Sequence, residues 1–263
     1  MKIKDFYSVL DGVSPFALSE EFIKKGAYDN SGIILDCGRE VKKVLFSLDL
    51  SEKVVSRAVR LGCDTVVTHH PAIYTPVSSL SVDGGNSALL KCALKKINVI
   101  SCHLNLDIAD GGIDDCLKDA LGGEKYKIID RITDSNGYGR VFSVKPETLG
   151  EFYKNAKKTL GSDKIIVYGD KKSVIEKVAS FCGAGSNDAF KFLLANGRSD
   201  ADLIATSDVP HHLLKEFIEK GKSVMIIPHY VSESYGFKKY KENIGEKAGK
   251  EITAFFYDDK RFR

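Results

Sequence analysis

The sequence predicts an α/β fold of two related lobes, each with a largely parallel sheet. Short β-branched runs alternate with stretches of helical periodicity along most of the 263 residues, as in chains built from strand–helix–strand units. The order of predicted elements and histidines in the first half occurs again in the second half. Histidines follow the ends of several predicted strands, which is where open α/β sheets usually bind ligands.

The first half alternates strands and helices in a regular way. Ser51 precedes a run with apolar residues at helical spacing and Gly62 follows it, so these two residues are the expected caps of a helix. His69 and His70 come directly after one predicted strand, and His103 comes shortly after the next. The predicted strands are 44–48, 63–68 and 97–101, and the predicted helices are 51–62 and 86–96.

The second half repeats this order. One predicted strand leads to the adjacent pair His211 and His212, and the next leads to His229. The predicted strands are 177–182, 201–206 and 223–227, with helices at 187–196 and from the histidine pair to residue 220.

The two halves differ in one spacing. The distance of 33 residues from His70 to His103 exceeds the 17 residues from His212 to His229 by 16. Segment 71–86 is rich in Ser, Pro and Gly and accounts for this excess, so we expect it to be an inserted loop.

Residues 126–169 separate the two halves and carry a further mixed pattern, around 127–131, 139–144, 149–160 and 164–168. We expect a first lobe of residues 1–125, joined by C-terminal residues from about 225 to 263, and a second lobe of residues 126–224. The two lobes are expected to face a shared metal cleft. The lysine-rich segment 237–250 is interpreted as a solvated helix face rather than a nucleic-acid-binding arm.

Composition argues against several classes of protein. The 39 basic and 36 acidic residues give a net charge of only +3, so no strong nucleic-acid-binding surface is expected. No apolar run approaches the roughly 18–20 residues of a membrane span, and the charged N-terminus lacks the apolar core of a signal peptide. Six scattered cysteines without CxxC spacing are typical of reduced protein. We therefore expect a cytoplasmic protein with no membrane partner.

The histidines are concentrated in a few clusters. Four of the six fall with two acids into three clusters, and the other two are the adjacent pair His211-His212. The three clusters are His69-His70, His103 with Asp107, and His229 with Glu233. Imidazole and carboxylate are ligands that Zn, Mn, Fe and Ni accept. Even three of these four histidines with the two carboxylates exceed the need of one tetrahedral structural zinc, so two divalent ions with open positions fit better.

Each cluster also has an ordinary structural interpretation. A single histidine near a strand end is usually a satisfied polar residue, Asp107 alone could be a helix cap, and Glu233 alone could be a surface acid. The joint occurrence of these residues at equivalent strand ends favours a metal centre over these separate explanations.

An ordered set of motifs extends through nearly the whole chain. Its members are 27–33 (AYDNSGI), 48–50 (LDL), 68–71 (THHP), 103–107 (HLNLD) with Gly111-Gly112, 183–185 (GAG), 208–212 (DVPHH) and 229–233 (HYVSE). The set resembles that of the Nif-three-like (Ngg-one-interacting-factor-three-like) family, whose bacterial members are often labelled type-two GTP cyclohydrolase I. The HLNLD motif is its most specific signature.

The resemblance implies a dinuclear metal site in a two-lobed α/β subunit, usually assembled as a toroidal homohexamer. The implied metal ligands are His69, His70, Asp107, His229 and Glu233. Glu233 would bridge both ions, and His103 would lie close to the metals without certainly binding them. Three positions depart from the family pattern, with Thr75 in place of a basic residue and Ser207 and Pro228 in place of glycines.

These observations predict a hydrolase with two divalent ions (Zn, Mn, Fe or Ni) that acts on a small molecule. The family label implies GTP as the substrate, and another nucleotide or a phosphoester is also compatible with a two-metal centre. His103 and His212 are candidate proton-transfer residues. Gly183-Ala184-Gly185 lacks the Lys-Ser/Thr of a P-loop, so any triphosphate would be held by metals and scattered cations. The alternative is a non-catalytic metal-binding regulatory or scaffold protein that forms a ring oligomer.

Overall fold

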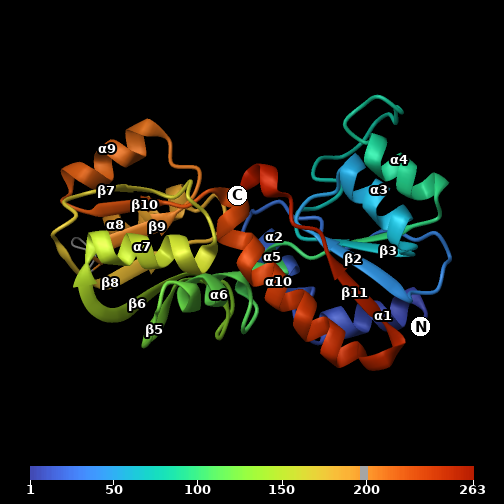
Figure 1. Cartoon of the computed structure of the whole chain (residues 1–263), viewed down its shortest axis with the longest axis horizontal. Coiled ribbons are helices and arrows are strands. Elements are labelled where there is room, and N and C mark those ends of the chain that lie inside the picture. The colour runs from blue at the N-terminus through green and yellow to red at the C-terminus, as the bar shows by residue number, and fades with distance from the viewer. Residues whose placement is uncertain (196–200) are drawn as a thin grey trace. The chain divides into compact units, whose positions relative to one another are not determined.

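The computed structural model describes residues 1–195 and 201–263 (Figure 1). The chain divides into two compact units, and the predicted α/β class with two sheets is confirmed. Unit 1 comprises residues 1–110 and 237–258, and unit 2 comprises residues 111–236 and 259–263. The predicted helix end at Asn196 lies outside the described residues.

Unit 1 is built on a sheet of short strands. These are β1 (Gly32–Leu35), β2 (Lys43–Ser47), β3 (Thr65–Thr68), β4 (Asn98–Ser101) and β11 (Thr253–Phe256). Within the described chain they form one five-stranded sheet in the order β1-β4-β3-β2-β11. All neighbours pair in parallel except β1 with β4. Thr68 pairs with Ser47 on one side and Ser101 on the other, so the residues that follow these strands share one edge of the sheet.

Helices make up most of the remaining regular structure of unit 1, and some of them pack on the faces of this sheet. The helices are α1 (Ile3–Asp11), α2 (Ala17–Lys24), α3 (Glu52–Leu61), α4 (Ser87–Leu94), α5 (Leu104–Ile108), the later part of α10 (His229–Ala248) and the short η1 (Gly249–Glu251). The core on one face joins α3 and α4 to β2, β3 and β4 through Val54, Cys92, Leu45 and Val66. On α10, Phe237 and Tyr240 contact Phe46 of β2.

Unit 2 has a parallel centre with antiparallel edges. Its strands are β5 (Tyr126–Arg131), β6 (Gly137–Thr148), β7 (Ile166–Tyr168), β8 (Val174–Ser180), β9 (Leu203–Thr206) and β10 (Ser223–Ile226). In the part of the chain that is described, the sheet order is β5-β6-β8-β9-β10-β7. β8, β9 and β10 are parallel, whereas β5, β6 and β7 pair antiparallel with their neighbours.

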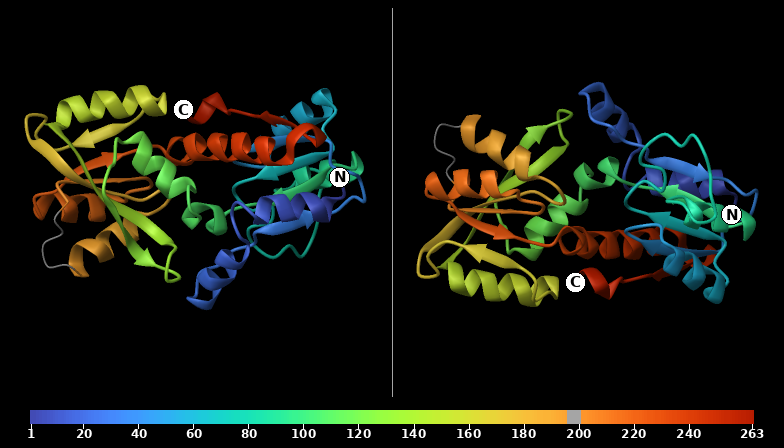
Figure 2. Two further views of the ribbon diagram at one scale, coloured as in Figure 1. Left: turned by 90° about the horizontal axis from the view of Figure 1, so that it is seen from below. Right: turned by 90° about the horizontal axis from the view of Figure 1, so that it is seen from above.

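The helices of unit 2 lie on both faces of the sheet. They are α6 (Ile113–Ala120), α7 (Leu149–Leu160), α8 (Ser186–Ala195), α9 (His211–Glu219), the first turns of α10 and the short η2 (Lys260–Phe262). Figure 2 shows α7 on one face and α8 and α9 on the other. The core beneath α8 and α9 includes Ala189, Phe217, Ile204 and Val224.

The repeated order of strands and helices predicted from the sequence is confirmed in both units. Helix α3 is capped as expected, because the Ser51 hydroxyl accepts from the Val54 N–H and Gly62 adopts φ +67°. Residues 71–86 contain no helix or strand, as expected for an inserted loop. The sequence did not predict α1, α2, β1, α5, α6 or β11. No helix in the described residues is long and apolar enough to cross a membrane.

Candidate metal centre

His69 and His70 follow β3 at the carboxyl edge of the unit 1 sheet. The His69 and His70 N–H groups both donate to the Leu48 carbonyl beyond β2, at 3.1 and 2.9 Å. Next to them, the Thr68 and Ser101 hydroxyls are hydrogen-bonded at 2.8 Å across β3 and β4. These bonds fix the backbone of the histidine pair, with the His69 side chain fully buried and His70 half-buried.

His103 and Asp107 follow β4 and are joined by a helical turn. His103 is the N-cap of α5, and its carbonyl accepts from the Asp107 N–H at 3.0 Å. Residues four apart on a helix lie on the same face, so both side chains are presented from one turn. The sequence showed the four-residue spacing of His103 and Asp107, but α5, the helix that presents both side chains together, was not predicted.

Three imidazoles converge in unit 1. The ring centroids are separated by 5.0 Å for His69 and His70, 5.3 Å for His69 and His103, and 5.9 Å for His70 and His103. Nε2 of His69 lies 3.4 Å from Oδ1 of buried Asp107. His69, His103 and Asp107 each offer a ligand atom, and these atoms all lie within 4.8 Å of one another. Two donors about 2.1 Å from one tetrahedral ion lie about 3.4 Å apart, so this donor set fits a metal.

Each of the three rings is oriented through its Nδ1 atom. The partners of Nδ1 are the Cys102 carbonyl for His69 (2.9 Å), Oδ1 of Asp49 for His70 (2.7 Å) and Oδ1 of Asp29 for His103 (2.8 Å). An acceptor at Nδ1 places the proton there and the lone pair on Nε2, which is the arrangement that metal-binding histidines usually show. Asp29 and Asp49 lie in the motifs AYDNSGI and LDL, but the sequence alone assigned them no role.

Asp29 is held in its charged form. Burial alone would raise the pKa of this carboxyl, but His103 and the hydroxyls of Ser19 and Ser31 lower its pKa below the ordinary value. The Ser31 hydroxyl donates to Asp29 at 2.7 Å and accepts from the His103 N–H at 3.0 Å. Asp29 and Ser31 therefore fix both the ring and the backbone of His103.

Unit 2 contributes a second histidine and carboxylate pair, on the first turns of α10. Nε2 of His229 lies 2.9 Å from Oε1 of Glu233, and Glu233 is only 3% exposed. This burial rules out the alternative interpretation of Glu233 as an ordinary surface acid. Nδ1 of His229 is 2.5 Å from Oδ2 of Asp208, so this ring is oriented in the same way as His70 and His103. The pair is a further set of imidazole and carboxylate donors suited to a divalent ion.

The loop after β8 lies against this second pair. Gly183 adopts φ +55°, and a Cβ atom there would come under 3.0 Å from Oε1 of Glu233 and within 3.3 Å of Nε2 of His229. Its N–H donates to the Ser232 hydroxyl at 3.0 Å. Ser207, where the family pattern has glycine, also donates to that hydroxyl, at 3.2 Å.

A buried ionic network supports the same loop. Asp114 accepts from the Cys182 N–H at 3.0 Å, directly before Gly183. Nε of Arg140 donates to Asp115 at 2.7 Å, and Asp114 lies 3.7 Å from the same guanidinium group. Burial alone would lower the pKa of Arg140, but the two carboxylates raise it. The network was not predicted, because Arg140 and Cys182 are 25 and 68 residues away from the adjacent acids Asp115 and Asp114.

A family profile matches residues 1–261, and its description is Duf34/NIF3 (NGG1p interacting factor 3). The chain belongs to the Duf34/NIF3 family. A relative named GTP cyclohydrolase 1 type 2 homolog, from Clostridium perfringens, is 30% identical over 257 residues that cover 96% of this chain and 94% of that protein. The family assignment confirms the resemblance carried by the ordered motifs.

Solved structures of similar fold also cover the whole length. A hypothetical protein from Staphylococcus aureus has a TM-score of 0.86 at 24% identity, over 98% of this chain and 97% of that one. Reduced HcgD from Methanocaldococcus jannaschii has a TM-score of 0.80 at 27% identity, over 98% of both chains. The two-unit α/β fold is therefore shared with known structures.

His211 and His212 do not occupy the position in unit 2 that His69 and His70 occupy in unit 1. β3 ends at Thr68 and β9 ends at Thr206, so the structural equivalents of the first pair are Ser207 and Asp208. His211 and His212 come later, as exposed residues in the first turn of α9. The sequence pattern aligned the two pairs by residue type, and the loop of 207–210 accounts for the shift. A proton-transfer role for His212 stays a prediction.

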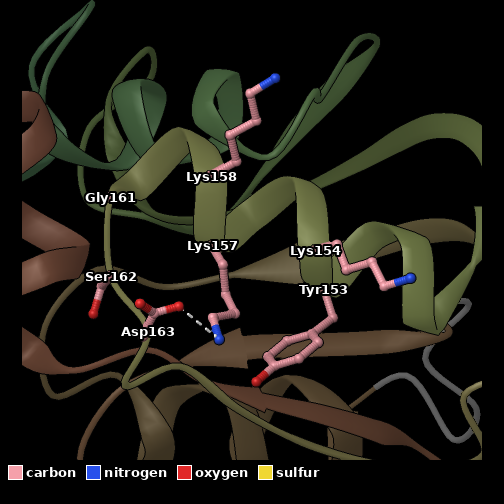
Figure 3. Close-up of a pocket in the computed structure, with 7 residues that line it drawn as sticks. All are labelled: Tyr153, Lys154, Lys157, Lys158, Gly161, Ser162 and Asp163. Carbon is pink, nitrogen blue, oxygen red and sulfur yellow. Dashed lines mark ion pairs between the residues drawn. The ribbon is translucent and has the colours of Figure 1, made fainter.

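A separate hollow of about 450 Å³ lies beside α7 in unit 2 (Figure 3). The Lys157 ammonium group pairs with Asp163 at 2.9 Å, and Figure 3 shows the ammonium groups of Lys154 and Lys158 pointing away from that of Lys157. The lysines therefore do not converge on a common anion, and we assign no ligand to this hollow.

Proposed function

We propose that the protein is a hydrolase that uses two divalent metal ions and acts on a nucleotide, GTP among the candidates. The observation that carries this proposal is the group of three imidazoles and Asp107 in unit 1, in which every ring is oriented through Nδ1. The names of relatives as GTP cyclohydrolase 1 type 2 homologs support the substrate class.

The proposed ligands are the five residues expected from the sequence, namely His69, His70, Asp107, His229 and Glu233. When bound, divalent ions at such a site lower the pKa of coordinated water toward neutrality and polarise the substrate. The Cys102 carbonyl, Asp49 and Asp208 keep His69, His70 and His229 in the tautomer that binds metal through Nε2. We propose that His103 transfers protons, because Asp29 holds one proton on its Nδ1 and leaves Nε2 to exchange another.

The test combines metal analysis with turnover. We expect the purified protein to contain close to two transition-metal ions per chain, since five ligands exceed the need of one site. Protein treated with chelator should regain hydrolysis of a nucleotide panel when Mn, Zn, Fe or Ni is added back. Absence of metal in protein never exposed to chelator, and after add-back, would refute the dinuclear centre. Full metal content without turnover on any nucleotide would instead favour a regulatory scaffold.

The proposed assembly is a homo-oligomeric ring of six chains, as the family resemblance implies. Sedimentation of the metal-loaded protein tests this directly, and a monomer at micromolar concentration would contradict it.

A further inference from the structure

Two exposed tyrosines lie beside the histidine cluster of unit 1. Tyr28 is 47% exposed and Tyr74 is 54% exposed. Their ring centroids are 5.5 Å apart with an angle of 69° between the planes. The Tyr74 ring also meets the His103 ring edge-on, at 6.3 Å and 80°. Aromatic side chains are usually buried to a large extent, so an exposed pair next to a group of metal-type ligands needs an explanation.

The backbone on either side of this pair is anchored to the site. Tyr28 directly precedes Asp29, which is buried and hydrogen-bonded to His103. Tyr74 directly follows Ile73, whose carbonyl accepts from the Asn30 side chain at 2.8 Å. The two loops are thus joined to each other by a hydrogen bond that leaves both aromatic rings at the surface.

We propose that Tyr28 and Tyr74 form an aromatic platform that binds the planar heteroaromatic ring of the substrate, a nucleobase, next to His103. The two rings stand at a steep angle, so one can offer its face and the other its edge to a planar ligand. Stacking on aromatic side chains tolerates any base, because every base has a π-face. The platform therefore confers a preference for ligands that carry a base, without selecting guanine over adenine.

This inference rests on the proposed function for its nucleotide substrate, but it concerns binding and not turnover. Stacking is typically worth about 1–3 kcal/mol per base, which corresponds to about 5- to 140-fold in affinity. Guanosine 5′-monophosphate carries the base at the position where ribose 5-phosphate carries its anomeric hydroxyl, so the ratio of their dissociation constants reports the contribution of the ring.

The experiment is calorimetric titration of metal-loaded protein with these two ligands. We expect the wild-type protein to bind guanosine 5′-monophosphate about 5- to 140-fold more tightly. Tyr28→Leu and Tyr74→Leu should each reduce that ratio, and the double variant should bring it close to one with metal content unchanged. Tyr168→Leu is the matched control, because Tyr168 is a 37% exposed tyrosine on β7 of unit 2, and it should keep the wild-type ratio.

A wild-type ratio near one, or a double variant that keeps the full ratio, would overturn the platform. These outcomes are distinct from failure of the proposed hydrolase. Preference for the base-bearing ligand without turnover would support the platform and contradict the hydrolase. Turnover without such a preference would support the hydrolase and contradict the platform.

A single fluorescent residue gives a second readout. The chain contains no Trp, so Tyr28→Trp would introduce its one tryptophan while preserving an aromatic ring. We expect this variant to retain the preference for the base, and its emission to change on saturation with guanosine 5′-monophosphate but not with ribose 5-phosphate. Equal responses to both ligands would contradict contact between residue 28 and the base.

Discussion

Units 1 and 2 share a three-stranded parallel core but differ in the residues at its carboxyl edge. Unit 1 places His69 and His70 directly after β3, whereas unit 2 places Ser207 and Asp208 after the equivalent strand β9. The repeat of the fold therefore does not repeat the histidine pair, although a histidine and an acid four residues apart follow the third parallel strand in both units. Unit 1 gathers three imidazoles, and unit 2 pairs one imidazole with a carboxylate on the same helix.

The units do share the way in which a histidine is oriented. Asp49 in unit 1 and Asp208 in unit 2 each follow a parallel strand and accept from Nδ1 of the histidine after the next strand. In unit 2, Asp208 stands where unit 1 has His70 and itself orients His229. The comparison indicates that in each unit a carboxylate after one parallel strand orients the histidine after the next strand, although the two carboxylates follow different strands of the repeat.

The largest expected effect concerns the buried carboxylates of the two units, Glu233 and Asp107. Glu233→Gln keeps the shape of the side chain but removes a negative charge, so metal affinity should fall by more than the about 10–100-fold typical of losing an outer partner. Any hydrolytic rate should fall with it. Asp107→Asn is the matched change in unit 1, and we expect loss of metal there as well.

Elemental analysis and turnover on the same preparations measure both effects. If one variant keeps full metal content while the other loses it, the centre depends on the donors of one unit alone. If both keep it, neither carboxylate is a ligand.

The next effect concerns His103, which is additional to the five proposed ligands. His103→Ala should keep most of the metal and lower the rate by about 10²–10⁴-fold, the usual contribution of a proton-transfer group. The ligand atoms of His69, His103 and Asp107 nevertheless lie within 4.8 Å of one another. Loss of metal as complete as in Glu233→Gln would therefore make His103 a ligand, which metal analysis of the variant decides.

A smaller effect is expected from removing the carboxylates that orient His70 and His229. Asp49 and Asp208 are a matched pair, since both side chains are 52% exposed and each contacts Nδ1 of one histidine. Asp49→Ala and Asp208→Ala should each reduce metal affinity by about 10–100-fold. Exposed ion pairs contribute at most about 1 kcal/mol to stability, so the free energy of unfolding should change little in Asp49→Ala. Asp208 adopts φ +50°, a conformation that Asp tolerates better than Ala, so Asp208→Ala should lose some additional stability. Metal titration and chemical denaturation separate the two quantities, and unchanged affinity in both variants would refute the orienting role.

Much of the fold could be predicted from the sequence because apolar periodicity and helix caps are set by residues close together in the chain. Residues 149–160, one segment of the mixed strand and helix pattern in the middle of the chain, form α7, and the caps of α3 were evident from Ser51 and Gly62. Short elements without a strong period, such as α5 and β11, were missed. The five-residue α5 is too short for its apolar spacing to stand out.

The candidate site was predictable only in part. Histidines and acids at strand ends could be recognised, but their orienting partners lie far away in the sequence. Asp29 is 74 residues from His103, and Asp49 is 21 residues from His70. The same limit explains why His211 and His212 were aligned with His69 and His70, since residue type was visible and strand register was not.

The smallest expected effect concerns the loop that supports Glu233 in unit 2. Gly183 and Gly111 both adopt positive φ, at +55° and +68°, so alanine at either position should cost roughly 1–2 kcal/mol of stability. They differ in their surroundings. A Cβ on Gly183 would crowd the Glu233 carboxylate, whereas a Cβ on Gly111 would meet nothing within 4 Å.

Gly183→Ala should therefore lower metal affinity by about 10-fold, the lower end of the range for a displaced supporting group, while Gly111→Ala should leave it unchanged. Denaturation curves check that the two variants lose similar stability, and metal titration measures the difference between them. Equal metal affinity in the two variants would show that contact between the Gly183 loop and Glu233 is not needed to position that carboxylate.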